Sequence, residues 1–284
     1  MATTTRGVQG TPCWVSLTPH DLGAAQEFYG AVFGWEFAPG IDEHGADIVG
    51  YANGVPVAGL IESTRTMGVR LPVAWTAYFA ADSADAVASR IRERGATVAV
   101  GPIAFGRGRM AWAADPQDAL FCVWEGPVAV GWHAGRGTSA VAWLELHTRD
   151  PFAAALFYGE VFEWDAQEPG RIDVRYEHDR VVLRAGGRTV AAMYGSGVAG
   201  SPDPGIRPQW QVHFCRSDVD AAVDRAVAAG GSVVAPARDT PLGRVATLRD
   251  PEGGLFHLTS GESQETGVCE EPDGSPEAPQ RPAQ

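Results

Sequence analysis

The hydrophobic and polar positions of this chain change period along its length, from alternation to a spacing of about 3.6 residues and back. Alternating runs predict half-buried strands, and the longer spacing predicts helices that pack on them. Asp21 and Asp150 stand where a helix can be capped, and Gly34 stands where the first helix can stop. In the first half the predicted elements are a strand over 13–18, a helix from Asp21 to Gly34, strands over 46–52, 54–61 and 74–80, a helix over about 83–94, and strands over 97–100, 108–114 and 119–125.

The chain contains an internal repeat. Residues 14–35 return as residues 143–164 without a gap, and residues 75–121 return as residues 210–256. A repeat of this length indicates two copies of one domain in tandem. Each copy shows the order βαβββ twice. A single βαβββ unit is too small to cover its own sheet, so we expect two units to pair, with their helices outside.

We therefore predict an α+β fold of two tandem domains, each of paired βαβββ units forming a curved mixed sheet around a concave ligand cavity. The chain is long enough for each domain to bury a core of its own. Its Pro- and Glu-rich end has too few apolar side chains to dock. The predicted boundaries are a flexible N-terminus over 1–10, a first domain over 11–126, a linker over 127–137, a second domain over 138–262 and a disordered tail over 263–284.

Composition excludes several partners and reactions. The formal net charge of -13 makes nucleic acid and anionic membranes poor partners. No apolar run approaches the ~20 residues of a membrane span, and the N-terminus lacks the apolar stretch of a signal peptide, so we expect a cytoplasmic protein. All 22 basic residues are arginine, which excludes lysine Schiff-base chemistry. The cysteines form no CxxC pair, so we expect reduced thiols and neither a disulfide scaffold nor a zinc knuckle.

Three motifs carry a family resemblance: the FYG-x-VFGW helix after the first strand, the DxxDAV helix that ends in glycine, and the closing DPxxxxF strand. Together they resemble the vicinal oxygen chelate superfamily, which includes glyoxalase I, bleomycin-resistance proteins, fosfomycin-resistance enzymes and extradiol dioxygenases. The resemblance covers most of residues 11–260. The openings TPCWVSL and VAWLELHTRD are similar to tandem-domain actinobacterial members, some glyoxalase-like or hydroxylase-like and some associated with aromatic polyketide pathways. The reaction stays open, because this scaffold hosts isomerisation, epoxide opening, ring cleavage and ligand sequestration.

Strand alternation assigns the repeated side chains to two faces of each sheet. One face is apolar in both copies, as expected for the side under the helices. The opposite face is mostly aromatic and hydroxylic in the first copy, whereas in the second it gathers imidazole, carboxylate and amide groups. This face holds Trp14, Ser16, Thr18, Thr76, Tyr78, Ala80, Leu120, Cys122 and Trp124 in the first copy, and Trp143, Glu145, His147, Gln211, His213, Cys215, Leu255, His257 and Thr259 in the second.

The resemblance implies metal ligands on the first strand, the strand that opens the second βαβββ unit, and the last strand. Those positions are Trp14, Thr76 and Cys122 in the first domain, and Trp143, Gln211 and His257 in the second. The first set cannot hold a metal, and the second contains one residue that cannot ligate. A rearranged set of Glu145, His213 and His257 would suit one divalent ion, because borderline metals accept imidazole and carboxylate together. The cofactor prediction is therefore none, or one divalent metal ion in the second domain.

Without a metal, the second cavity is still polar, and a histidine beside a glutamate is a natural pair for proton transfer. We predict Glu145 or His213 as the base, His257 as an acid or a ligand, and Gln211 as the group that orients a carbonyl or enolate. A structural pairing of Glu145 with a histidine, which would only satisfy buried polar groups, stays open. The other predicted ligand-binding residues are Trp143, His147 at the strand end, Trp14, Tyr78, Trp124 and Arg244.

Tyr78 and Trp124 face the first cavity and indicate a flat aromatic ligand. Arg244 could bind an acidic ligand group or pair with a carboxylate such as Asp250. The predicted partner is a small organic molecule, with planar aromatic compounds as candidates, and the protein is expected to be a monomer or homodimer. The predicted function is an isomerase/lyase-type or proton-transfer enzyme on an aromatic or polyketide-like secondary metabolite. The alternative is a non-catalytic ligand-binding or antibiotic-resistance protein that sequesters its ligand.

Overall fold

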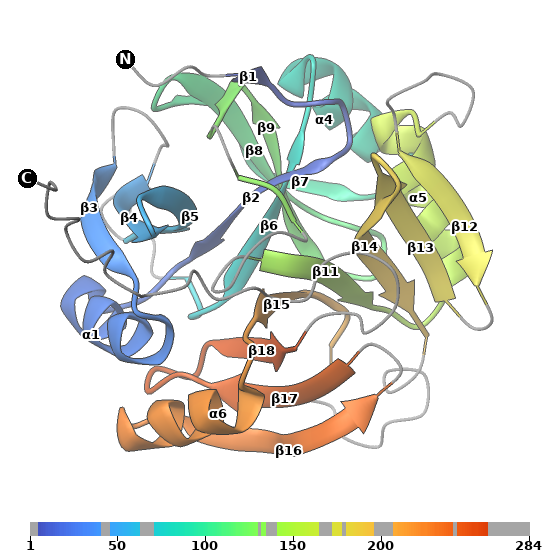
Figure 1. Ribbon diagram of the computed structural model, residues 1–284. Coiled ribbons are helices and arrows are strands. Elements are labelled where there is room, and N and C mark those ends of the chain that lie inside the picture. Colours follow the sequence, from blue (N-terminus) through green and yellow to red (C-terminus); the bar gives the residue numbers. More distant parts are fainter. Residues whose placement is uncertain are drawn as a thin grey trace, which may run out of the picture.

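The computed structural model describes residues 5–40, 46–62, 71–129, 132–134, 141–164, 172–177, 180–195, 207–240 and 243–260. These residues form two eight-stranded mixed sheets and four helices, which confirms the predicted α+β fold of two tandem domains (Figure 1). None of the described helices has the length and apolar character to cross a membrane.

The first domain repeats the order βαβββ twice, as predicted. Its elements are β2 (Pro12–Leu17), α1 (Leu22–Phe33), β3 (Glu36–Gly40), β4 (Ala46–Ala52), β5 (Val55–Leu60), β6 (Trp75–Ala80), α4 (Ala84–Glu93), β7 (Thr97–Phe105), β8 (Gly108–Ala114) and β9 (Leu120–Glu125). The strand order in the sheet is β3-β4-β5-β2-β6-β9-β8-β7, with β2 parallel to β5 and β6 parallel to β9. The antiparallel pairing of β2 with β6 joins the two units.

The second domain has the same arrangement. Its elements are β11 (Val141–His147), α5 (Pro151–Phe162), β12 (Asp173–Glu177), β13 (Arg180–Ala185), β14 (Arg188–Tyr194), β15 (Gln209–Cys215), α6 (Val219–Ala228), β16 (Ser232–Thr240), β17 (Gly243–Arg249) and β18 (Leu255–Thr259). The strand order is β12-β13-β14-β11-β15-β18-β17-β16, with β11 parallel to β14 and β15 parallel to β18.

The predicted caps position the first helix of each domain. Oδ1 of Asp21 accepts a hydrogen bond from the backbone N–H of Ala24 over 3.0 Å, and Asp150 caps α5 in the same way. Gly34 ends α1 in the left-handed conformation with φ 69°, as predicted, but α5 ends at Glu163 with φ 56°. The side chain of Glu163 accepts a hydrogen bond from Gln9, which ties this helix end to the N-terminal segment.

The segments flanking the first domain are more ordered than predicted. β1 (Thr5–Arg6) pairs with β10 (Pro127–Val128), and the backbone N–H of Gly10 donates to the carbonyl of Ala80 over 2.7 Å. Residues 5–10 are therefore not a flexible end, and residues 127–129 belong to the first domain rather than to a free linker. The predicted disordered tail over 263–284 lies outside the described residues.

The two domains share one continuous core, so the expectation of two separate cores is wrong. Phe33 of α1 packs 5.0 Å from Phe214 of the second sheet, and Phe162 of α5 packs 5.3 Å from Phe79 of the first sheet. The helices also meet across the junction, α1 beside α6 and α4 beside α5 (Figure 1). Each domain thus buries the first helix of the other, because neither apolar sheet face is covered by its own helices alone.

Two repeat-related lines of hydrogen bonds cross this core. In one, Nε1 of Trp75 donates to the hydroxyl of Tyr29 over 3.1 Å, and that hydroxyl donates to Oδ2 of Asp250 over 2.9 Å. In the other, Trp210 donates to Tyr158 over 2.9 Å, and Tyr158 donates to Asp115 over 3.1 Å. Each line begins on a strand and helix of one domain and ends on a turn of the other.

The aspartates of these lines also shape the turns that hold them. Oδ1 of Asp250 accepts from the backbone N–H groups of Glu252 and Gly254 over 3.0 and 2.7 Å. Asp115 makes the equivalent pair of bonds in its own turn. One oxygen of each carboxylate therefore closes a turn, and the other oxygen ties that turn to the tyrosine of the other domain.

Removal of one tyrosine hydroxyl should destabilise both domains together. Tyr29→Phe leaves the buried indole N–H of Trp75 without an acceptor, which costs ~1–3 kcal/mol of unfolding free energy. Urea unfolding should show this loss in a single transition, because the core is continuous. Tyr158→Phe should behave alike, whereas Tyr176→Phe on the exposed surface should stay within about 0.5 kcal/mol of the unchanged protein. Two separate transitions would contradict the shared core.

Candidate functional site

One row of side chains crosses four neighbouring strands of the second sheet. Trp143, His213, His257 and Thr247 occupy paired positions on β11, β15, β18 and β17. Neighbouring strands lie ~4.8 Å apart, so flat side chains in register on one face stack. The rings of Trp143 and His213 are 4.8 Å apart at 20°, and those of His213 and His257 are 4.4 Å apart at 18°. Oγ1 of Thr247 ends the row, 3.1 Å from Nδ1 of His257.

A second row lies two residues further along β11. Glu145 and Gln211 are paired positions on β11 and β15, and His147 follows Glu145 on the same face at the end of β11. Nε2 of His147 and Oε1 of Glu145 are hydrogen-bonded, and Oε2 of Glu145 lies 3.8 Å from Nε2 of His213. The carboxylate thus lies between an imidazole of the ring stack and an imidazole at the strand end.

Burial and charge set the protonation of this site. Burial favours the neutral form of Glu145, but the hydrogen bond from His147 and the charges of the neighbouring histidines outweigh it and lower the pKa of Glu145 to about 2. Burial lowers the pKa of His213 to about 4, although the carboxylate opposes this. Burial also lowers the pKa of His257 well below its usual value. At neutral pH the site therefore holds an anionic carboxylate beside two neutral imidazoles.

Five buried polar atoms of these rows have no hydrogen-bond partner within the described part of the chain. They are Nε1 of Trp143, Oε1 of Gln211, both ring nitrogens of His213 and Nε2 of His257. Polar groups buried in native proteins are nearly always paired, because an unpaired group costs ~1–3 kcal/mol. Five such atoms on one face of one sheet indicate a place where another molecule supplies the partners.

The predicted metal ligands do not converge. An imidazole binds a metal through a lone pair in its ring plane, so ligand rings have to point at one centre. The near-parallel rings of His213 and His257 direct their lone pairs along separate lines. Across the described ranges, no group of three or more His, Cys, Asp or Glu side chains could hold a metal ion. As these side chains are arranged, Glu145, His213 and His257 do not converge on one ion.

The first domain carries the corresponding row with different chemistry. Trp14, Tyr78, Cys122 and Trp112 are paired positions on β2, β6, β9 and β8. The hydroxyls of Ser16 and Tyr78 are hydrogen-bonded over 3.0 Å. Burial raises the pKa of Tyr78 and of Cys122, so neither group ionises near neutral pH. This row offers stacking and weak hydrogen bonding.

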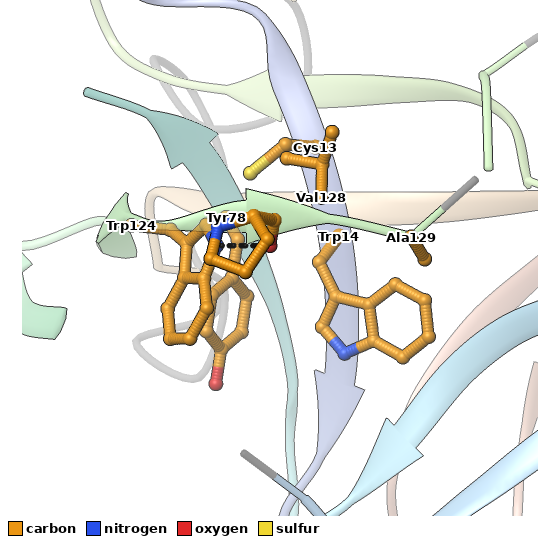
Figure 2. A pocket seen from close by; sticks show the side chains of 7 residues that line it. Cys13, Trp14, Tyr78, Trp124, Val128 and Ala129 are labelled. Carbon is orange, nitrogen blue, oxygen red and sulfur yellow. Dashed lines mark hydrogen bonds between the residues drawn. The ribbon is translucent and has the colours of Figure 1, made fainter. Parts of the chain in front are cut away.

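Residues after β9 cover this first row. Nε1 of Trp124 donates to the carbonyl of Pro127 over 3.0 Å, and Nε1 of Trp132 donates to the carbonyl of Val57 over 2.8 Å. The cavity left under residues 127–129 has a volume of about 20 Å³. Figure 2 shows the side chains that line it. It is lined by Cys13, Trp14, Tyr78, Trp124, Pro127, Val128 and Ala129. About one water fits there, so the planar ligand predicted for Trp14, Tyr78 and Trp124 has no room beneath this cover.

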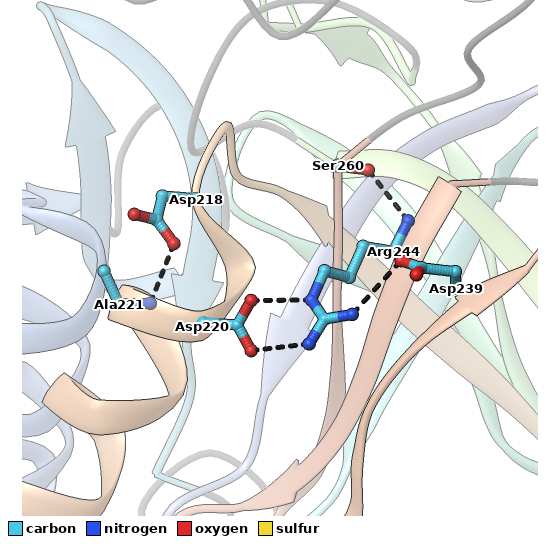
Figure 3. A network of polar contacts seen from close by, with 6 residues as sticks. All are labelled: Asp218, Asp220, Ala221, Asp239, Arg244 and Ser260. Atoms are coloured by element: carbon cyan, nitrogen blue, oxygen red, sulfur yellow. Dashed lines mark hydrogen bonds and ion pairs between the residues drawn. The ribbon is translucent and has the colours of Figure 1, made fainter.

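Arg244 lies on the side of β17 that faces α6. Its guanidinium donates to both carboxylate oxygens of Asp220, over 2.6 and 2.8 Å, and to Asp239 over 3.1 Å (Figure 3). The repeat-related Arg109 makes the same kind of ion pair with the first turn of α4. The expected pair with a carboxylate is therefore present, with Asp220 and Asp239 as partners instead of Asp250, and this arginine joins a helix to its strand.

Several features of the site were not predicted from the sequence. Thr247 is the partner of His257, and the comparison of the two copies could have found it, because it stands where the first copy has Trp112. Trp132 lies in a glycine-rich segment without hydrophobic periodicity, so the sequence did not predict where its side chain packs. The expectation of reduced thiols is wrong at Cys215, which is disulfide-bonded, whereas Cys13 and Cys122 are free.

Known proteins match both halves of the chain. Residues 143–259 match the family described as a glyoxalase-like domain, and residues 13–49 match the bleomycin resistance protein-like N-terminal family. The putative glyoxylase CFP32 of Mycobacterium bovis is 32% identical over 254 residues, covering 88% of this chain and 94% of that protein. The chain belongs to the vicinal oxygen chelate superfamily. Another relative of this vicinal oxygen chelate protein is the anthracycline biosynthesis protein DnrV of Streptomyces peucetius, 36% identical over 270 residues, covering 89% of this chain and 94% of that protein.

Solved structures share the fold of this vicinal oxygen chelate protein. The Mn(II)-bound glyoxalase from Novosphingobium aromaticivorans has a TM-score of 0.56 at 19% identity, covering 88% of this chain and 82% of that chain. The 2,3-dioxygenase LapB from Pseudomonas sp. KL28 has a TM-score of 0.57 at 12% identity, covering 92% and 96%. At such identities the likeness shows the fold alone, and the manganese belongs to the glyoxalase in which it was found.

The buried histidine of the stack should make folding sensitive to acid. The unfolded chain takes up a proton on His213 below about pH 6.5, whereas the folded chain, with a pKa of about 4, does not. Stability therefore falls as the pH falls through this window, by about 2 kcal/mol between pH 7 and pH 5 for this group. Glu145, with its pKa of about 2, stays ionised throughout.

Urea unfolding at both pH values measures this effect. His213→Asn should remove about 2 kcal/mol of the difference in unfolding free energy between pH 7 and pH 5. His20→Asn changes an exposed histidine of the first domain and should keep the full difference. An equal pH dependence in His213→Asn and in the unchanged protein would show that this ring is not buried in neutral form.

Proposed function

We propose that the second domain is the functional half of this chain and that it transfers a proton on a small organic molecule. The observation that carries the proposal is the hydrogen bond between Glu145 and His147, beside a group of buried polar atoms that need a partner. A quarter of the His147 side chain is exposed, so a ligand can reach it, whereas the Glu145 side chain is 17% exposed. A carboxylate that is hydrogen-bonded to one nitrogen of an imidazole fixes the orientation and the tautomer of that imidazole.

In this pair His147 is the base and Glu145 is a positioning residue. With a pKa of about 2, Glu145 is too weak a base to remove a proton near neutral pH. Its carboxylate accepts the Nε2–H of His147, which leaves the lone pair of that ring on Nδ1. This assignment replaces the bases expected from the sequence, since burial lowers the pKa of His213 to about 4 and makes it a weak base.

The proposed proton transfer is an enolisation. The proton of a carbon next to a carbonyl passes to Nδ1 of His147, the electron pair of that C–H bond forms the C=C bond of the enolate, and the π pair of the carbonyl moves to its oxygen. The N–H groups of Trp143 and His213 are unpaired within the described residues and donate to the negative charge that develops there. Return of the proton to another carbon isomerises the molecule. Gln211 presents Oε1, so it accepts from a substrate hydroxyl.

The relatives and the site walls support an aromatic, polyketide-like substrate. DnrV and DauV, the latter from Streptomyces sp. strain C5, are both named anthracycline biosynthesis proteins and are each 36% identical to this chain. The rings of Trp143 and Tyr194 lie beside His213 and His147, at 4.8 and 6.3 Å. Flat side chains of this kind stabilise a flat ligand by ~0.5–1.5 kcal/mol per stacked ring beyond burial.

A non-catalytic role in ligand binding or resistance is the second candidate. It is favoured by the match of residues 13–49 to the bleomycin resistance protein-like N-terminal family. A sequestering protein needs the cavity but no base. The two candidates therefore differ in whether a bound molecule exchanges or rearranges its hydrogens.

Deuterium exchange separates the two candidates. The probe is a polycyclic aromatic ketone with hydrogen on the carbon beside its carbonyl, incubated with the protein in D₂O and followed by mass spectrometry. We expect the protein to speed deuterium uptake at that carbon. His147→Gln should lower the rate by ~10²–10⁴-fold, which is the usual contribution of a general base. Glu145→Gln should lower it less, because the imidazole remains but loses the carboxylate that orients it.

The repeat provides matched controls for this experiment. Ser16 and Thr18 stand in the first domain where Glu145 and His147 stand in the second, and Ser16→Ala and Thr18→Ala should keep the full exchange rate. Wild-type exchange in His147→Gln would remove this residue from the mechanism. Tight binding of the ketone without any exchange would favour sequestration over catalysis.

A further inference from the structure

The ring stack of the second domain is a recognition surface with a definite hydrogen-bonding pattern. Trp143, Gln211, His213 and His257 are each at most 8% exposed, and each presents at least one polar atom that is unpaired among the described residues. The atoms lie on adjacent strands, since Trp143 pairs with His213 and His213 pairs with His257. The residues that carry these atoms therefore lie side by side on one face of the sheet.

The pattern contains both donors and acceptors. Nε1 of Trp143 is a donor, and Oε1 of Gln211 is an acceptor. Both nitrogens of His213 are unpaired, and a neutral imidazole has one of each kind. Nε2 of His257 takes either role, because the hydroxyl of Thr247 can donate to Nδ1 or accept from it. A ligand therefore has to bring donors as well as acceptors to satisfy this face.

Charge narrows the ligand class further. Within the described part of the chain, Glu145 and His147 are the charged or ionisable neighbours that shift the pKa of both His213 and His257, and no arginine is among these neighbours. Oε2 of Glu145 lies 3.8 Å from Nε2 of His213. A carboxylate or phosphate ligand would meet this negative charge, and as a pure acceptor it would leave Gln211 unpaired.

We propose that Trp143, Gln211, His213 and His257 bind an uncharged, flat molecule that carries both hydroxyl and carbonyl groups on its rings, as hydroxyquinones do. The hydroxyls donate to Gln211 and to one nitrogen of His213, and the carbonyl accepts from Trp143 and from the other nitrogen. This inference rests on the proposed function in one respect, which is that the second domain is the one that holds the ligand. It is independent of whether a proton is transferred.

Binding of three related anthraquinones tests the pattern without any turnover. The probes are a dihydroxyanthraquinone with both hydroxyls at positions remote from the carbonyls, its dimethyl ether, and an anthraquinone carboxylate. Dissociation constants come from calorimetry and from quenching of tryptophan fluorescence. We expect the dihydroxy compound to bind about tenfold or more tightly than the ether, which keeps the acceptors and loses both donors. The carboxylate should bind most weakly.

Matched variants test whether the preference for the dihydroxy compound over its ether arises in the second domain. His213→Phe keeps a flat ring in the stack and removes both nitrogens, so it should bring the dihydroxy compound and its ether to within about twofold of each other. Tyr78→Phe makes the equivalent change in the first domain and should leave the preference intact. His257→Phe, paired with Cys122→Ala, provides a second test should His213→Phe fold poorly.

The outcomes separate this inference from the proposed function. A preference for the dihydroxy compound that is lost in His213→Phe supports the inference even where the deuterium exchange experiment shows no catalysis. The inference is overturned if the ether binds as tightly as the dihydroxy compound, if the carboxylate binds most tightly, or if the dihydroxy compound does not bind. It is also overturned if the preference survives in both ring variants. None of these outcomes depends on His147.

Discussion

The reciprocal hydrogen bonds from tryptophan to tyrosine to aspartate are the constraint on which the rest of this structure depends. Each line joins a strand and a helix of one domain to a turn of the other, and the tyrosines are fully buried. Because Asp250 and Asp115 also close their own turns, neither turn can move without breaking bonds in both domains. The apolar faces of the two sheets are thereby committed to a shared core.

The same strand register presents two chemistries on those opposite faces. In the first domain the central positions are Tyr78 and Cys122, and in the second they are His213 and His257. The backbone geometry of the two rows is the same, since both rows follow from in-register pairing of neighbouring strands. Residues 127–129 and Trp132 cover the first row, and the second row carries five buried polar atoms that are unpaired among the described residues. The two rows therefore differ in side-chain chemistry although they share one strand register.

Periodicity and the repeat predicted the fold well, because strand alternation and helix capping are local properties of the chain. They placed Glu145, His213 and His257 on one face, as the strand pairing has them. They could not predict the exchange of helix contacts between domains or the cover over the first row, which depend on segments far apart in sequence. Arg244 was misplaced for the same reason: its partner Asp220 is on a neighbouring helix, and spacing alone does not show which acidic group is nearer.

The ring stack also explains why the chemistry of the second domain moves away from the metal-ligand positions that the family resemblance implies. Trp143 stands at the first of those positions, in register with His213, so its flat ring packs against the imidazole and holds it parallel. Parallel rings suit hydrogen bonding along their edges and do not suit convergence on one ion. Two residues further along the strand, Glu145 meets His147 instead of a third ring, and an anionic carboxylate beside a reachable imidazole is the arrangement that proton transfer requires. Trp143 thus keeps the rings on this face parallel, which is the arrangement on which the proposed recognition and deprotonation of an organic molecule depend.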